Sequence, residues 1–153
     1  MKIEILYGTE TGNAEMLAED LEAHLSGDHD VTLTNLSDAD PAALAVDALN
    51  VLVCSTYGEG DLPASAQPFA DRIKATAPDL SQVRFAIFGL GDREYETFGL
   101  GSDKLASLLI GQGATQLGER LVHDASGSDL AEDMAIEWVD AQVQTAATQS
   151  WAA

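Results

Sequence analysis

The residues that could do chemistry in this sequence lie in three glycine-containing segments, each directly after a short apolar run. The first segment reads Gly8-Thr9-Glu10-Thr11-Gly12-Asn13 and precedes an amphipathic stretch. Hydroxyls and backbone N–H groups at the start of a helix are good donors to an anion such as phosphate. The segment contains no Lys or Arg and lacks the Gly-Lys-Ser/Thr ending of a P-loop. It therefore predicts an anion site with neutral donors, unless Thr11 or Asn13 only caps the helix.

The second and third segments each place a tyrosine beside glycines. They read Ser55-Thr56-Tyr57-Gly58-Glu59-Gly60-Asp61 and Gly89-Leu90-Gly91-Asp92-Arg93-Glu94-Tyr95-Glu96-Thr97-Phe98. Aromatic rings at a water-facing crevice suit stacking on a flat heteroaromatic ligand, although a single exposed tyrosine can also lie at a rim without a role. The third segment lacks the last glycine of the dinucleotide fingerprint and follows the wrong strand for it. The two tyrosines together favour a stacking site.

Strand and helix patterns alternate along the chain. Alternating or continuous apolar runs predict strands at 2–7, 31–36, 49–54, 83–88 and 115–122. Helical spacing predicts helices at 13–25, from after 63 to about 76, at 102–110 and at 129–143, with a short helix at 41–45. Asp129 and Glu132 have the spacing of a capping box. This order is typical of a doubly wound parallel sheet, in which ligands bind outside the carboxyl ends of the strands.

Length and hydropathy restrict the class of protein. The 153 residues suit one domain, which we expect at 1–145, with a frayed tail at 146–153. A nicotinamide-binding domain would need well over roughly a hundred further residues, so we do not expect a self-contained reductase. No apolar run is long enough to span a bilayer, and residues 2–6 are too short and too charged for a signal peptide. We therefore expect no membrane association.

Charge and cysteine content restrict the partners. The chain has 26 acids and 7 bases, a formal net charge of −19. This charge opposes binding to nucleic acid and anionic membranes, and it indicates either a basic protein partner or adaptation to high salt. One cysteine, Cys54, excludes an intrachain disulfide and suits a reducing cytoplasm. We expect Cys54 in the core, and neither a zinc site nor a catalytic residue, because the three histidines stand apart from any nucleophile motif.

The three segments together, in this order, resemble the flavodoxin family, in particular short-chain flavodoxins of the MioC type and the FMN-binding domains of diflavin reductases. The match is carried by residues 9–15, 55–61 and 89–98, and it covers nearly the whole chain. The resemblance implies an α/β, flavodoxin-like, doubly wound five-stranded parallel sheet of order 2-1-3-4-5 with helices on both faces. It also implies one non-covalent FMN, and transfer of single electrons from a separate reductase to an acceptor protein.

The resemblance implies a role for individual residues. The FMN phosphate would be surrounded by Thr9, Glu10, Thr11, Gly12, Asn13 and Ala14. One side of the isoalloxazine ring would be wrapped by Ser55, Thr56, Tyr57 and Gly58, and the other by Leu90, Gly91, Asp92 and Tyr95, with Tyr95 as the stacking ring. The sequence departs from the family at two of these positions. Ala14 stands where many flavodoxins have Thr, and Tyr57 where many have Trp.

The acids of the ring segments would receive basic redox partners, a flavin reductase as donor and an acceptor enzyme. They are Glu59, Asp61, Glu94 and Glu96. We expect a cytoplasmic monomer. An FMN-dependent NAD(P)H oxidoreductase acting on a quinone or similar small molecule is the alternative function, and a flavin-free scaffold is a third. A response-regulator receiver is disfavoured, because it needs acids where this chain has Gly8-Thr9 and Ser55-Thr56.

Overall fold

A parallel sheet forms the centre of the computed structural model, which describes residues 1–10, 12–56, 61–91, 99–124 and 130–148. The strands run in the order β2-β1-β3-β4-β5, and β6 also pairs with β4. Their bounds are β1 Lys2–Gly8, β2 Asp30–Asn35, β3 Leu49–Ser55, β4 Arg84–Gly91, β5 Thr115–Gln116 and β6 Leu121–Asp124. Every one of these pairs is parallel, which confirms the predicted fold class and strand order.

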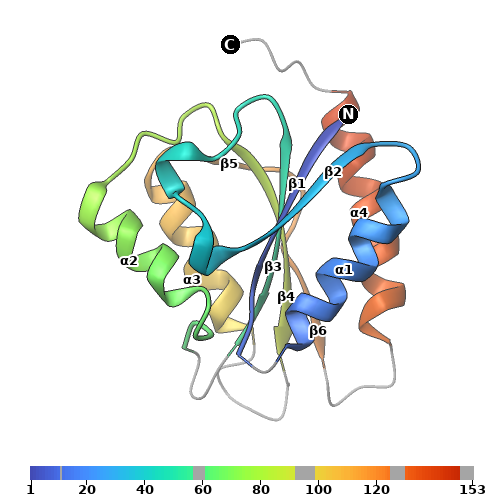
Figure 1. The fold of residues 1–153 in the computed structure, drawn as a ribbon, viewed down its shortest axis with the longest axis horizontal. Helices are drawn as coiled ribbons and strands as arrows, with labels where there is room; N and C mark the ends of the chain where they lie inside the picture. The colour runs from blue at the N-terminus through green and yellow to red at the C-terminus, as the bar shows by residue number, and fades with distance from the viewer. Residues whose placement is uncertain (11, 57–60, 92–98, 125–129, 149–153) are drawn as a thin grey trace.

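Helices cover both faces of this sheet (Figure 1). Helices α1 (Asn13–Leu25) and α4 (Ala131–Ala147) pack together on one face, and α2 (Gln67–Thr76) and α3 (Leu100–Gly111) lie on the other. Two 3₁₀ helices, η1 (Leu36–Asp38) and η2 (Pro41–Ala43), follow β2. This doubly wound arrangement is the one that alternating strands and helices dictate, because each crossover must cover one face of the sheet.

Each central strand divides its side chains between two apolar layers. Ile3 and Ile5 of β1 belong to the layer under α1 and α4, whereas Leu6 belongs to the layer under α2 and α3. Trp138 of α4 is 7% exposed, and its ring centroid lies 5.5 Å from that of Phe88 in β4. Burial on both faces explains why β3 and β4 are nearly continuous apolar runs in the sequence.

The register of the sheet brings its carboxyl ends to one level. Gly8 of β1 pairs with Cys54 of β3, Cys54 pairs with Gly89 of β4, and Gly89 pairs with Val122 of β6. A Cβ added to Gly8 would lie 2.8 Å from the Cβ of Ala66, so the segment ahead of α2 packs directly on the backbone there. The three glycine-containing segments therefore leave the sheet side by side.

The predicted fifth strand, residues 115–122, is wrong as a continuous element. The structure divides it into β5 and β6, both paired with β4. Leu117 still donates its N–H to the carbonyl of Phe85 (2.7 Å), but Gly118 then adopts a φ of +66°, in the left-handed region. This conformation turns the chain out of the ladder before pairing resumes at Leu121.

Several predicted boundaries also differ from the structure. Helix α2 begins at Gln67, after a turn, and α3 begins at Leu100, ahead of the predicted start at 102. Helix α4 continues to Ala147, past the predicted end at 143, because Ala146 is fully buried in the core. The predicted short helix at 41–45 is the three-residue η2. Asp129, the expected start of the last helix, lies outside the described residues.

Replacing Gly118 by Ala tests the cause of the break between β5 and β6. A Cβ there would lie 2.9 Å from Cδ of the buried Gln142, on a backbone with φ of +66°. We expect Gly118→Ala to lower the free energy of unfolding by about 1–3 kcal/mol, measured by urea denaturation. Gly111→Ala is the control, because nothing lies within 4 Å of its Cβ position. Equal stability of the two variants would contradict this explanation.

Candidate functional site

The first segment ends at a helix start that no side chain of the described residues caps. Gly12 is the N-cap of α1, with a φ of +101°, and it has no side-chain capping bond, so Asn13 does not act as the cap. The first intrahelical bond runs from the Met16 N–H to the Gly12 carbonyl (3.0 Å). The N–H groups of Asn13, Ala14 and Glu15 therefore have no partner within the helix. A helix start of this kind offers convergent donors to an anion.

Thr9 shapes the same segment from within. Its Oγ1 accepts a hydrogen bond from the Gly12 N–H at 2.8 Å. A hydroxyl that accepts one bond keeps its own hydrogen for donation, so Thr9 can add a donor to the three N–H groups. Thr11, the remaining hydroxyl of the predicted phosphate site, lies outside the described residues.

A hydrogen bond between Tyr7 and Glu15 links β1 to α1, the two elements on either side of the first segment. The buried Tyr7 hydroxyl donates to Oε2 of Glu15, in the first turn of α1, at 2.7 Å. This hydrogen bond, with burial and the charge of Glu15, raises the pKa of Tyr7 to about 12. The bond also occupies one oxygen of a carboxylate that stands close to the helix start. Neither residue was predicted for the site from the sequence.

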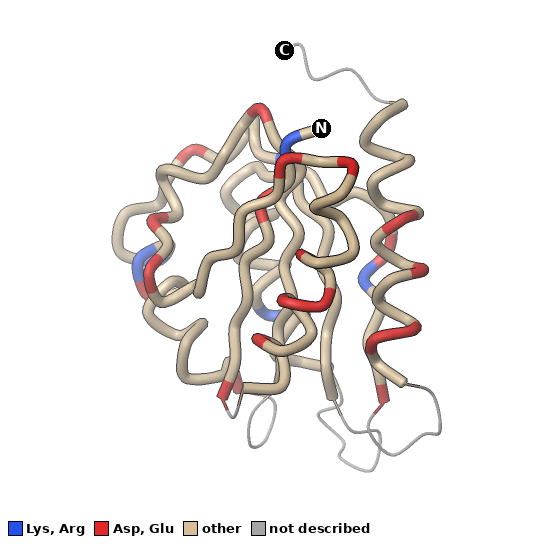
Figure 2. The backbone as a smooth tube through the Cα atoms, turned by 45° about the vertical axis from the view of Figure 1, so that its right-hand side comes forward, with Lys and Arg blue, Asp and Glu red and all other residues tan. Residues whose placement is uncertain are grey.

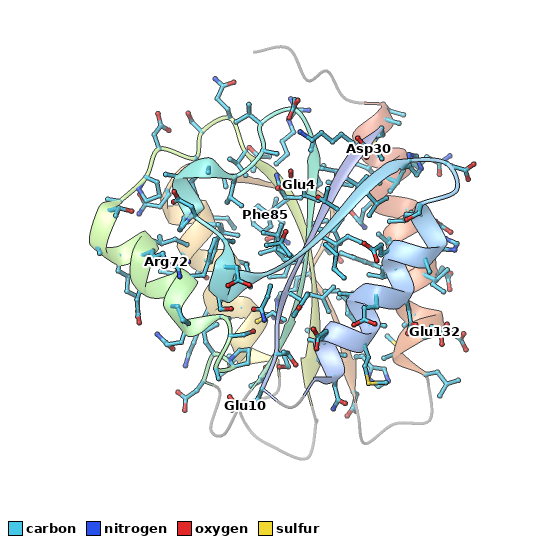
Figure 3. All side chains as sticks on the ribbon, viewed as in Figure 1. Glu4, Glu10, Asp30, Arg72, Phe85 and Glu132 are labelled. Carbon is cyan, nitrogen blue, oxygen red and sulfur yellow. The ribbon has the colours of Figure 1, made fainter. Side chains whose placement is uncertain are left out.

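A segment far along the chain holds the first segment in place. The Thr9 N–H donates to Oγ of Ser65 (2.7 Å), and the Ser65 N–H donates to the Thr9 carbonyl (3.2 Å). Oε1 of Glu10 accepts from the Ala64 N–H (2.8 Å), and Figure 3 shows Glu10 at the carboxyl edge of the sheet, opposite Asp30. No local pattern could have indicated these bonds, because the partners are 54 or 56 residues apart.

The starts of the second and third segments are also tied together. The Thr56 N–H donates to the Leu90 carbonyl (3.1 Å), and Ser55 Oγ donates to the Gly8 carbonyl (3.4 Å). Oγ1 of Thr56 accepts from the Gly101 N–H of α3 (3.0 Å). A Cβ on Gly101 would lie 2.9 Å from Cα of Thr56, so α3 begins in direct contact with this strand end.

The structure thus brings several predicted site residues to one edge of the sheet. They are Thr9, Glu10, Gly12, Asn13, Ala14, Ser55, Thr56, Leu90 and Gly91. The predicted ring residues Tyr57, Gly58, Asp92 and Tyr95 lie outside the described residues, as do the predicted docking acids Glu59, Glu94 and Glu96. The donors at the start of α1 fit a phosphate monoester. The ends of β3 and β4 lie beside them, where the second and third segments begin.

Cys54 lies in the core and is not a candidate reactive residue. Its side chain is fully buried, which confirms its predicted place in the core, and burial raises the pKa of the thiol to about 12. A thiol with that pKa is neutral at pH 7 and a poor nucleophile. In the part of the chain that the structure describes, no three His, Cys, Asp or Glu side chains come together as metal ligands. Over the same residues, no helix has the length and apolarity needed to cross a bilayer.

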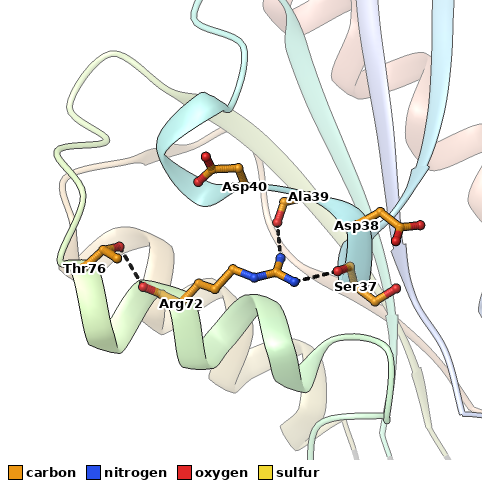
Figure 4. A pocket seen from close by; sticks show the side chains of 6 residues that line it. All are labelled: Ser37, Asp38, Ala39, Asp40, Arg72 and Thr76. Atoms are coloured by element: carbon orange, nitrogen blue, oxygen red, sulfur yellow. Dashed lines mark hydrogen bonds between the residues drawn. The ribbon is translucent and has the colours of Figure 1, made fainter.

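A pocket of about 420 Å³ lies beside α2, on the side of the molecule away from the helix start of α1 (Figures 3 and 4). Arg72 crosses it and donates to the carbonyls of Ser37 (2.7 Å) and Ala39. The guanidinium thereby ties α2 to η1, with two exposed aspartates at the rim. These bonds give Arg72 a structural role in the packing of α2.

A parallel sheet of this order with helices on both faces is the flavodoxin-like fold (Figure 1). The model of the family described as Flavodoxin matches residues 5–138, and the chain belongs to the flavodoxin family, whose cofactor is FMN. This confirms the resemblance seen in the three segments.

Individual relatives agree with this assignment. Protein MioC of Escherichia coli (strain K12) is 36% identical over 141 residues, which are 92% of this chain and 95% of that protein. NADPH–cytochrome P450 reductase of Homo sapiens is 37% identical over 140 residues, 88% of this chain but 20% of the reductase. The crystal structure of oxidised Flavodoxin 2 from Bacillus cereus has a TM-score of 0.79 at 28% identity, over 94% of this chain and 99% of that one.

The ionisation of Tyr7 tests the hydrogen bond between Tyr7 and Glu15. Its pKa is about 12 in the folded chain and 10.0 ordinarily, so the unfolded chain loses the proton first. The stability from this bond is complete below pH 10 and is lost as the pH rises towards about 12. We expect the difference in phenolate absorbance between the wild type and Tyr7→Phe to titrate near 12, and Glu15→Gln to lower that midpoint. A midpoint of 10 in the wild type would contradict the bond.

Proposed function

We propose that this chain binds one FMN non-covalently at the carboxyl edge of its sheet and carries single electrons from a separate reductase to an acceptor protein. The observation that carries the proposal is the uncapped start of α1, where three backbone N–H groups converge beside Thr9. Because the chain belongs to the flavodoxin family, we assign the phosphate of FMN as this anion.

The phosphate would be held by neutral groups. The three N–H groups at the start of α1 that have no partner within the helix, and the hydroxyls of Thr9 and Thr11, are the donors we assign to it. Glu10 serves this site by holding the segment to Ala64, since a carboxylate cannot donate to a phosphate. A chain with a net charge of −19 repels a free anion, so directed donors must overcome that repulsion.

The ring would lie between the second and third segments. Ser55, Thr56, Tyr57 and Gly58 are assigned to one side, and Leu90, Gly91, Asp92 and Tyr95 to the other. When bound, FMN supplies reversible one-electron and two-electron chemistry. The described residues support this placement, because the Thr56–Leu90 bond holds the two strand ends together where the segments begin.

Basic redox proteins are the proposed partners, and they would dock at Glu59, Asp61, Glu94 and Glu96. The side chain of Asp61 is 68% exposed, and its Oδ1 lies 3.8 Å from Nζ of Lys104. An exposed pair at that distance stabilises the fold little, so a partner cation can replace Lys104. Acids are spread over most elements of the molecule (Figure 2), which is also what adaptation to salt would produce. We further propose that the protein acts as a monomer in the cytoplasm.

The absorption spectrum of the purified protein mixed with FMN is the first test of this function. We expect bound oxidised flavin at one equivalent, and no turnover of NADPH until a separate reductase is added. Steady-state NADPH turnover by the protein alone would favour the alternative, an NAD(P)H oxidoreductase. A protein that remains colourless after added FMN is removed by gel filtration would contradict the proposal.

The phosphate donors can be tested by affinity. Thr9→Val removes the acceptor of the Gly12 N–H and a donor to the phosphate. We expect it to weaken FMN binding by about 1–3 kcal/mol in a fluorescence titration, and to change riboflavin binding far less. Thr32→Val on the exposed edge strand β2 is the matched control. If wild-type protein binds riboflavin as tightly as FMN, the phosphate site is wrong.

Docking can be tested by the salt dependence of electron transfer. The second-order rate with a basic partner should fall steeply with ionic strength, because screening shortens the Debye length to about 8 Å at physiological salt. Neutralising Glu59, Asp61, Glu94 and Glu96 together should flatten this dependence. A control variant with the same charge change carries substitutions at four exposed acids ahead of or at the start of β2, β3 and β4: Asp28, Asp30, Asp47 and Asp79. An equal effect of the control would contradict docking at the flavin edge.

A further inference from the structure

The carbonyl of Gly99, the N-cap of α3, receives three hydrogen bonds. The donors are the Asp103 N–H (3.3 Å), Ser102 Oγ (3.1 Å) and Nη1 of Arg120 (2.9 Å). A carbonyl oxygen has two lone pairs, so this peptide is held by more donors than it has acceptor sites. The side chains of Ser102 and Arg120 therefore hold this peptide in addition to the helical bond from Asp103.

Arg120 supplies the charged part of this network. Its Nη1 also donates to Oγ of the fully buried Ser102 (2.8 Å), and its Nη2 lies 3.9 Å from Oδ1 of Asp103. The Arg120 side chain is 26% exposed. Hydrogen bonds from a charged donor in a half-buried place are stronger than neutral ones, and the planar guanidinium fixes their directions.

The start of α3 is connected to the predicted flavin site by hydrogen bonds already described. Gly101 of α3 donates its N–H to Oγ1 of Thr56, and Thr56 donates its N–H to the Leu90 carbonyl. Ser102 packs on Gly89 of β4 so closely that no Cβ would fit there. A shift of the α3 start would therefore move Thr56 and the end of β4 together.

We propose that Arg120 is a positioning residue for the flavin site. It holds the start of α3 so that Gly101 keeps Thr56 and Leu90 in the geometry that receives the ring. This inference rests on the proposed FMN function. It predicts that loss of Arg120 weakens FMN binding although Arg120 itself is not assigned a contact with the cofactor.

Arg72 provides a matched control. It is also a half-buried arginine, and its guanidinium also donates to two oxygens, here the carbonyls of Ser37 and Ala39, on the α2 side of the molecule. Arg72→Gln and Arg120→Gln therefore remove the same charge and similar bonds. Only the second variant loosens the segment that carries Thr56.

The experiment measures the FMN dissociation constant of wild type, Arg120→Gln, Arg120→Lys and Arg72→Gln by fluorescence titration at a temperature where all are folded. We expect Arg120→Gln to raise the FMN dissociation constant about tenfold, the effect of losing one charge-assisted hydrogen bond. Arg120→Lys should recover part of the lost affinity, and Arg72→Gln should leave the dissociation constant unchanged. Hydrogen exchange of apo-protein peptides covering 52–56 and 99–105 should quicken in Arg120→Gln but not in Arg72→Gln.

Wild-type affinity in Arg120→Gln, or an equal loss in Arg72→Gln, would overturn the proposal. If Arg120→Gln does not fold, Ser102→Ala takes its place, because it removes the Ser102 bond to the Gly99 carbonyl and one of the two oxygens to which Arg120 Nη1 donates. Wild-type affinity in that variant, together with wild-type exchange at 52–56 and 99–105, would equally overturn the proposal. If wild-type protein does not bind FMN, the proposed function fails. In that case unchanged exchange at 52–56 would show separately that Arg120 does not position Thr56.

Discussion

The site depends on one row of backbone pairs across the carboxyl end of the sheet. Gly8, Cys54, Gly89 and Val122 stand side by side on β1, β3, β4 and β6. Because the strands are parallel and end at the same level, the segments that follow them must leave the sheet together. Small residues in this row are a packing requirement, since Ala66 and Ser102 press against the two glycines. The row places the starts of the three segments side by side at one edge of the sheet.

Hydrogen bonds between these segments turn proximity into a defined geometry. Ser65 exchanges two bonds with Thr9, and Thr56 joins Leu90 to Gly101. Gly12 at the start of α1 offers no capping side chain, and a residue that caps with its side chain would make the helix more stable by about 1 kcal/mol. The Tyr7–Glu15 hydrogen bond holds the end of β1 to the first turn of α1. A helix start held in this way is suited to receive a ligand in place of a capping side chain.

Sequence reasoning predicted a doubly wound parallel sheet and the three segments, because alternation of strand and helix and the glycine positions are local features. The strand order was predicted from the resemblance to the flavodoxin family. Sequence reasoning failed where tertiary contacts determine the bounds of an element or the role of a residue. Gly118 has a positive φ at the break in the fifth strand, where the buried Gln142 leaves no room for a Cβ, and α4 extends because Ala146 is buried. The roles of Ser65 and Arg120 could not be predicted, since each acts on a residue at least eighteen positions away. The roles of the ring residues Tyr57, Gly58, Asp92 and Tyr95 stay predictions.

The central claim is that backbone groups at the start of α1 hold the phosphate of FMN. An amide ¹H–¹⁵N spectrum of the apo-protein, recorded before and after addition of FMN or riboflavin, tests it most directly. We predict large FMN-induced shifts of the Asn13, Ala14 and Glu15 amides that riboflavin, which has the same ring and no phosphate, does not reproduce. Equal shifts of these three amides with riboflavin, or none with bound FMN, would contradict the account.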